Sequence, residues 1–161
     1  MKNKLNIRVL GIFIAGILWG VVFSYFLLGI LIKKTIILEY ETKFDNVNEA
    51  TEEIVKKCAL TREWIPKVSA CSLPQPSDNS KISVITLCNA KIAKSIVDDY
   101  SSRKLASIIP CQFAVYTNKD GKIIISRLNF RLVGWLLGGN STQMAEKAVR
   151  EQKEILRDIL K

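Results

Sequence analysis

The chain begins with a long apolar run and then changes to short alternating patterns of apolar and polar residues. No charged residue lies within residues 9–32, which are bounded by Arg8 on one side and by Lys33 and Lys34 on the other. As a helix this run rises about 36 Å, enough to cross the ~30 Å hydrocarbon core of a bilayer. A secretory signal peptide has a shorter apolar core and a small-x-small cleavage motif, which this run lacks. We therefore predict an N-terminal tail and a single uncleaved transmembrane helix over residues 1–34.

The charges beside the apolar run indicate its orientation. The side that precedes it carries more positive charge than the side that follows it, with Lys2, Lys4 and Arg8 against Lys33 and Lys34. Because positive flanks stay in the cytoplasm, we expect a cytoplasmic N-terminus and an extracytoplasmic C-terminal domain. The expected location is the cell membrane, with one pass and with the lipid bilayer as a partner.

Two glycines lie inside the apolar run at a spacing that is known from paired membrane helices. Gly16 and Gly20 form a GxxxG pattern, which lets two spanning helices approach closely. Glycine is also common in unpaired spanning helices, so the pattern fits a dimer face or no special role.

Residues 35–161 are predicted to form one α+β domain. β-branched residues and period-two alternation predict strands at 35–42, 64–70, 81–88, 111–117 and 122–128. Apolar residues at helical spacing predict helices at 46–59, 89–100 and 142–160. A glycine-containing turn joins the last two strands as a hairpin, and a polar, proline-punctuated loop covers 72–80. This order indicates helices packed on one face of a largely antiparallel sheet.

Composition excludes several classes of function. The net charge of +9 comes largely from the basic residues that flank the apolar run, and no basic stretch of the domain is interleaved with aromatic residues. We therefore expect no nucleic-acid partner. The chain contains no histidine, which removes Ser-His and Cys-His nucleophile pairs and the usual zinc or haem ligand. Neither a Walker A loop nor a dinucleotide fingerprint occurs, so we expect no catalytic residues, no metal and no cofactor.

Four cysteines remain as candidates for chemistry, namely Cys58, Cys71, Cys88 and Cys111. Their spacing fits no metal-binding knuckle, and an even number in an external domain permits two disulfides. Cys88 ends a predicted strand just before a helix, where the helix dipole favours a thiolate. If its strand and that of Cys111 are antiparallel neighbours, the sulfurs lie at the same sheet edge and are able to pair. If the strands are parallel, the sulfurs lie about 20 Å apart. The alternative is two buried cysteines that pack as small hydrophobic residues.

The segments around Cys88 and Cys111 resemble a known family. Residues 87–93 read LCNAKIA and residues 109–116 read IPCQFAVY, followed by the hairpin at Gly121. The pair resembles the C-N-P-x-x-A and P-C-x-x-x-V-Y segments of the domain-of-unknown-function family 302. The resemblance covers about residues 45–160, and Ala90 departs from the usual proline. It implies a compact α+β domain, often dimeric, with no assigned activity, and its matched positions are Cys88, Asn89, Pro110, Cys111 and Tyr116.

Two further segments carry candidate surfaces. The connector at 130–137 is strongly apolar, so it is either a short core helix or a docking face for a partner or the bilayer, presented by Phe130, Trp135 and Leu136. The segment before the last predicted helix consists of Gly138, Gly139, Asn140 and Ser141. Its free backbone N–H groups either bind an anion or form an ordinary helix cap.

Three functions follow from these features. The first is a non-catalytic accessory or interaction domain, a single-pass subunit of a membrane complex or a homodimer. The second is a thiol-active or sulfur-handling module that uses Cys88 and Cys111. The third is a domain that captures a small ligand between its sheet and its helices.

Overall fold

A computed structural model of the chain describes residues 2–61, 63–68 and 80–161. It separates into two units, residues 1–35 and residues 36–161. The first unit consists of one helix, α1 (Lys2–Thr35). Its 24 residues from Val9 to Ile32 are long and apolar enough to cross a membrane, and none of the apolar span is buried. A signal sequence near an N-terminus shares these properties.

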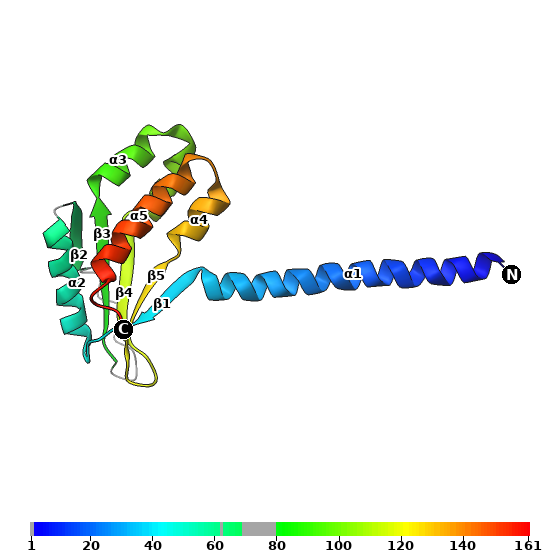
Figure 1. The fold of residues 1–161 in the computed structure, drawn as a ribbon, viewed down its shortest axis with the longest axis horizontal. Helices are drawn as coiled ribbons and strands as arrows, with labels where there is room; N and C mark the ends of the chain where they lie inside the picture. Colours follow the sequence, from blue (N-terminus) through cyan, green and yellow to red (C-terminus); the bar gives the residue numbers. More distant parts are fainter. Residues whose placement is uncertain (1, 62, 69–79) are drawn as a thin grey trace. The chain divides into compact units, whose positions relative to one another are not determined.

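The second unit is built on a five-stranded sheet in the order β1-β5-β4-β3-β2 (Figure 1). Every neighbouring pair of strands is antiparallel. The strands are β1 (Ile37–Glu41), β2 (Trp64–Val68), β3 (Ile82–Asn89), β4 (Cys111–Thr117) and β5 (Ile123–Leu128). The predicted α+β class and the antiparallel sheet are confirmed.

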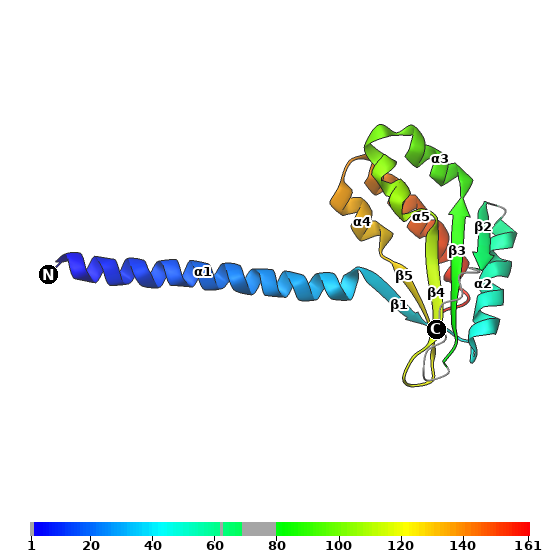
Figure 2. The same cartoon turned by 180° about the vertical axis from the view of Figure 1, so that it is seen from behind.

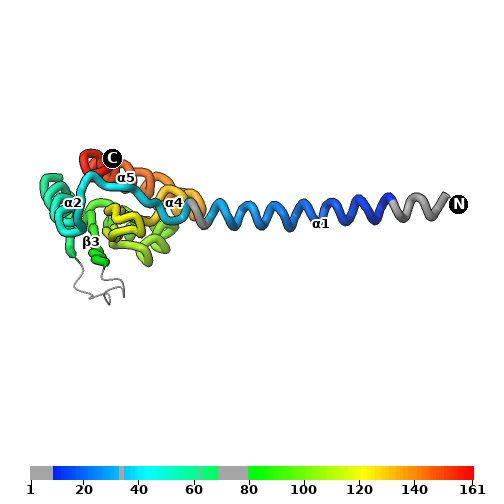
Figure 3. The backbone as a smooth tube through the Cα atoms, turned by 90° about the horizontal axis from the view of Figure 1, so that it is seen from below, coloured from blue at the N-terminus to red at the C-terminus, as the bar shows by residue number. Residues whose placement is uncertain are grey.

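The helices of this unit cover one face of the sheet (Figure 2). They are α2 (Val47–Thr61), α3 (Ala90–Asp98), the 3-10 helix η1 (Tyr100–Ile108), α4 (Phe130–Leu137) and α5 (Asn140–Leu156). Across the domain, α2, α5 and α4 follow one another, with α2 and α4 at opposite ends (Figures 1 and 3). The core lies between this layer and the sheet, where Ile85, Phe113 and Ile125 are fully buried.

The side-chain alternation of the strands explains this core. Successive side chains point to opposite faces of a sheet, so every second residue of β3, β4 and β5 faces the helices. Along β5 the buried positions are Ile123, Ile125 and Arg127, with half-buried residues between them. The residues between the buried positions therefore face the opposite side of the sheet, which α2, α4 and α5 do not cover.

Element boundaries differ from the sequence prediction at several places, and the final helix ends at Leu156 rather than at residue 160. Helix α1 continues to Thr35, so β1 starts two residues later than predicted. The predicted helix at 89–100 ends at Asp98, and η1 follows it without having been predicted, because its polar sequence lacks a sustained apolar period. Helix α5 starts at Asn140 rather than at residue 142. Residues 69–70 of the predicted strand and residues 72–79 of the predicted loop lie outside the described part of the chain.

The pairing of α4 with α5 depends on one glycine. A Cβ atom added at Gly134 would lie 2.4 Å from Ala145 Cβ and 2.9 Å from the carbonyl oxygen of Ser141. The chain then turns sharply through Gly138 and Gly139, whose φ angles of 68° and 58° suit glycine. The small residue and the tight turn together let the two helix backbones approach closely.

We expect Gly134→Ala to lower the free energy of unfolding by ~1–3 kcal/mol, since the added methyl group overpacks the α4–α5 contact. Chemical denaturation of the detergent-solubilised chain, followed by circular dichroism, measures this change. The double variant Gly134→Ala/Ala145→Gly removes the closest of the contacts. It should recover part of the loss, and no recovery would contradict the proposed cause.

Candidate functional site

The structure places Cys88 and Cys111 on adjacent strands but on opposite faces of the sheet. Strands β3 and β4 are antiparallel, and Leu87 rather than Cys88 is the residue opposite Cys111. Leu87 and Cys111 are buried on the helical side, so Cys88, one residue further along, points to the other side. The strands are thus the antiparallel neighbours that a disulfide requires, but both cysteines are free thiols.

Burial controls the reactivity of two of the cysteines. Cys58 is a free thiol buried in α2. Desolvation raises the pKa of Cys58 to about 12. It also raises the pKa of Cys111 to about 11, against the smaller opposing effect of the Gln152 amide. Such thiols are protonated at neutral pH and are poor nucleophiles. Cys88 is half-exposed, and Cys71 lies outside the described residues.

Alkylation should therefore separate the cysteines. In a Cys71→Ser chain treated with N-ethylmaleimide at pH 7.5, we expect rapid modification of Cys88 alone. A thiol with a pKa of about 11 is a thiolate in roughly one molecule in a few thousand at that pH, so Cys111 should react only after unfolding. Peptide mapping by mass spectrometry, with and without urea, measures both rates. Fast modification of Cys111 in the folded chain would be inconsistent with its burial.

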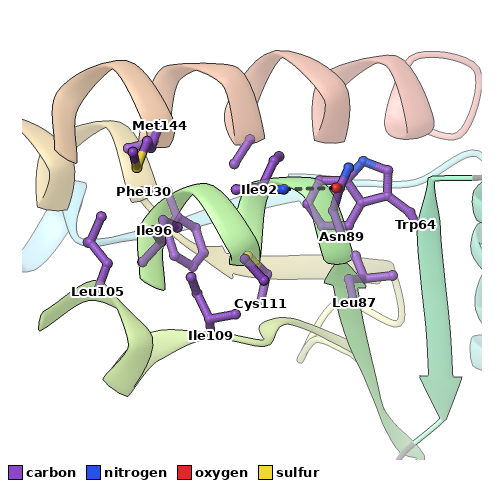
Figure 4. Close-up of a pocket in the computed structure, with 13 residues that line it drawn as sticks. Trp64, Leu87, Asn89, Ile92, Ile96, Leu105, Ile109, Cys111, Phe130 and Met144 are labelled. Atoms are coloured by element: carbon purple, nitrogen blue, oxygen red, sulfur yellow. Dashed lines mark hydrogen bonds between the residues drawn. The ribbon is translucent and has the colours of Figure 1, made fainter. Parts of the chain in front are cut away.

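A narrow crevice lies between the sheet and the helices α3, α4, α5 and η1 (Figure 4). Its wall is apolar except at a few points, with Ile96, Leu105, Phe130 and Met144 among the side chains that face it. The open space amounts to about 20 Å³, which is room for about one water molecule. The crevice therefore has no space for a small ligand between sheet and helices unless the layers move apart.

Asn89 lies at one end of this crevice and joins three elements. Its Oδ1 accepts hydrogen bonds from the backbone N–H groups of Lys91, at 3.0 Å, and Ile92, at 3.1 Å, and so caps α3. Its Nδ2 donates to Glu151 on α5 at 2.9 Å. Trp64 Nε1 on β2 donates to the same carboxylate oxygen at 2.8 Å. Because both ends of the buried amide are occupied, the geometry supports a structural role for this motif residue.

We expect Asn89→Ala to lower the free energy of unfolding by about 1–3 kcal/mol through loss of the cap and of the bond to Glu151. The matched control is Asn46→Ala, which removes an exposed cap on α2, where Asn46 Oδ1 accepts from Glu49 N at 2.9 Å. The control should cost less because it removes the cap alone. Equal losses in thermal unfolding would show that the bond to Glu151 adds nothing to stability.

Arg127 is a buried polar residue that the sequence analysis did not single out. It is 4% exposed, and its Nη1 donates to Gln152 Oε1 on α5 at 2.7 Å. Its guanidinium lies 5.6 Å from the ring centre of Tyr40. No ion pair between described residues joins it to a carboxylate, and its Nε has no hydrogen-bond partner there. The sequence did carry a signal for this burial. Ile123, Ile125 and Arg127 are every second residue of β5, so the alternation places Arg127 on the core face.

The remaining motif positions lie near the start and the end of β4. Pro110 immediately precedes this strand and follows a cis peptide bond. Tyr116 lies on the face away from the helices, and its hydroxyl donates to Glu39 of β1. Burial, and then the adjacent Glu39 carboxylate, raise the pKa of Tyr116 to about 12. Tyr116 is therefore a protonated hydrogen-bond donor at neutral pH, and it links β4 to the edge strand.

The glycine-rich segment before α5 lies beside a carboxylate of the protein itself. The Asp99 side chain accepts hydrogen bonds from Ser102 and Ser101 and interacts with Asn140, and these contacts lower its pKa, with Ser102 as the largest cause. Ser141 is buried and its hydroxyl lies 3.3 Å from that of Ser102. An external anion at this segment would have to compete with Asp99. The anion site remains a prediction.

The sheet face opposite the helices carries a broad groove of about 580 Å³. Side chains from four strands reach it, including Val84, Ala114, Ser126 and Ile37, and the connection from η1 to β4 forms one wall. Across the whole face, nine positions have apolar, cysteine or tyrosine side chains, namely Ile37, Ile65, Ile82, Val84, Cys88, Ala114, Tyr116, Ile124 and Leu128. Polar and charged residues occupy the other positions, including Lys67 and Glu39 at the two edges.

The predicted docking residues of α4 separate into two groups. Phe130 is buried and lines the crevice, whereas Trp135 and Leu136 are 68% and 63% exposed. Among the described residues, no three Cys, Asp or Glu side chains come together as a metal-binding group. Trp135 and Leu136 are therefore the exposed part of the predicted docking face.

Comparison with known proteins agrees with this fold. The family model described as "Domain of unknown function DUF302" matches residues 37–161. The chain is similar to the crystal structure of an uncharacterised conserved DUF302 protein from Bacillus stearothermophilus, with a TM-score of 0.63 and 14% sequence identity. The match covers 78% of this chain and 98% of the other. No curated protein matches the chain.

Proposed function

The chain belongs to the DUF302 family, and we propose that it is a membrane-anchored, non-catalytic interaction domain that associates with a second copy of itself. The observation that carries this proposal is the largely apolar sheet face that α2, α4 and α5 leave uncovered. Exposed faces of antiparallel sheets are usually polar, because alternate residues meet water. An apolar face instead gains free energy when a second surface covers it.

The charges at the two edges of this face favour a second copy as the occupant. Glu39 lies on the edge strand β1 and Lys67 on the opposite edge strand β2. A two-fold axis parallel to the strands would stack the β1 edge of one copy on the β2 edge of the other. Each lysine would then face a glutamate, with an offset of two residues along the strand, about 7 Å, which a long lysine side chain can span. The pairing is self-complementary, as a two-fold interface requires.

The apolar helix supplies a second, independent argument. Gly16 and Gly20 lie on one face of α1, and apart from the adjacent backbone of the helix nothing lies within 4 Å of a Cβ built at either position. Two spanning helices can approach closely at such a face. Anchoring both copies in one bilayer also raises their effective concentration, so a weak contact between sheets is enough to hold a dimer.

The membrane anchor is supported by the exposure of the apolar run. The large side chains between Val9 and Ile32 are each at least 38% exposed. Such a surface is unstable in water and stable in hydrocarbon. The anchor is therefore the simplest environment for α1, with the domain outside the cytoplasm as the flanking charges indicate.

We expect Ala114→Glu to weaken self-association at least tenfold. Ala114 lies on β4 in the middle strand of the sheet and lines the open groove, so the new carboxylate would be desolvated in a face-to-face dimer. Sedimentation equilibrium of the detergent-solubilised full chain measures the dissociation constant. The matched control is Leu60→Glu, which places the same charge at a 71% exposed apolar position on α2.

Both variants should keep the circular dichroism spectrum of the unaltered chain, and the control should keep its dimer constant. A chain that stays monomeric at every concentration would exclude the homodimer. Extraction from membranes in a fixed ratio with a different subunit, lost in Ala114→Glu, would instead assign the face to that subunit. Release of the full-length chain by carbonate washing would exclude the membrane anchor.

A further inference from the structure

Helix α4 is apolar on both of its faces, although only one face is buried. Successive residues of a helix are separated by about 100°, so Phe130, Val133, Gly134 and Leu137 share one side. The other side carries Leu132, Trp135 and Leu136, of which the last two are among the most exposed large apolar residues of the domain. A helix that is apolar all round is normally enclosed on all sides. The outer face of α4 therefore lacks an apolar environment in the domain as described.

Positive charge borders this outer face. Arg131 projects from the first turn of α4 and shares a groove of about 260 Å³ with Arg150 and Lys153 of α5. At the other end of α4, the Lys104 ammonium donates a hydrogen bond to the carbonyl oxygen of Leu137 at 3.3 Å. Glu146 is the acidic residue in the groove and lies 3.7 Å from Arg131. In this groove and at the far end of α4, four basic residues thus accompany one acidic residue, Glu146.

Helix α4 begins beside the first residue of the domain. The backbone N–H of Asn129, just before α4, donates to the carbonyl oxygen of Ile36 at 2.8 Å. Ile36 is the first residue of the domain. Residues 33–36 connect it to the end of the apolar run and span at most ~14 Å when fully extended. Helix α4 itself has 8 residues, a rise of about 12 Å. Its outer face is therefore within reach of the bilayer surface.

From these observations we infer that the outer face of α4 rests in the lipid headgroup layer, with Trp135 and Leu136 inserted and the basic groove beside anionic headgroups. Tryptophan and leucine on one side and basic residues beside them are typical of helices that lie in a membrane interface. The bilayer is favoured over a protein partner because the surrounding charge is positive and the chain enters the membrane nearby. This inference rests on the membrane anchor of the proposed function and adds a second point of contact, which fixes the orientation of the domain.

Tryptophan fluorescence in nanodiscs tests this contact on the full chain. In a Trp19→Phe background, nanodiscs of phosphatidylcholine with 30% phosphatidylglycerol carry brominated acyl chains near the headgroups, which quench nearby indoles. Subtracting the signal of Trp19→Phe/Trp135→Phe, in which only the buried Trp64 emits, isolates Trp135. We expect the brominated lipid to lower the fluorescence of Trp135 at least twofold. This quenching should fall by half or more in the Arg131→Glu variant, and also in nanodiscs without phosphatidylglycerol.

The matched control moves the tryptophan to a distant exposed position. In Trp19→Phe/Trp135→Phe/Leu60→Trp the new indole is on α2, at the other end of the helical layer (Figure 1), and should not be quenched. Equal quenching at positions 60 and 135, or no quenching at 135 while the chain stays in the discs, would overturn the bilayer contact alone. If Trp135 is shielded from aqueous acrylamide but is not quenched by brominated lipid, the outer face of α4 contacts a protein. That result would also overturn the bilayer contact. A chain that does not stay in the discs would remove the anchor, and the inference with it.

Discussion

The two-residue repeat of the antiparallel strands determines most of what this domain presents to its surroundings. In a sheet whose strands are all antiparallel, neighbouring residues point to opposite faces, and the face that meets the helices becomes the core. The same repeat places every intervening side chain on the opposite face. The buried core at Ile85 and Phe113 and the open groove at Val84 and Ala114 are therefore consequences of one register.

That register also explains why Cys88 and Cys111 do not form a disulfide in this structure. Cys88 and Cys111 lie at the same end of two neighbouring strands. Cys88 is, however, one residue beyond the position opposite Cys111, so the two sulfurs lie on opposite faces of the sheet. Asn89, one residue after Cys88, faces the interior and connects α3, β2 and α5 through its amide. Asn89 thus stabilises the fold from inside the motif, whereas its neighbour Cys88 belongs to the open face of the sheet.

The surfaces that remain have different characters. The sheet face is broad, apolar and edged by opposite charges, which suits a second copy of the same face. The outer side of α4 is narrow and carries Trp135 beside the basic groove at Arg131, which suits anionic headgroups. A domain held by α1 and by α4 would have a defined orientation relative to the bilayer.

The apolar helix, the α+β class, the antiparallel hairpin and the family were predictable from the sequence, because each depends on local periodicity or on a short motif. The sequence also showed that 130–137 is too apolar for an ordinary connector. Which side of that segment is buried could not be predicted, because it depends on the contact of Gly134 with Ala145, on a helix that comes later in the chain. The tertiary structure likewise decided the relation of Cys88 to Cys111 and the burial of Arg127 against Gln152. These depend on pairing between residues far apart in the chain, and no local pattern carries that information.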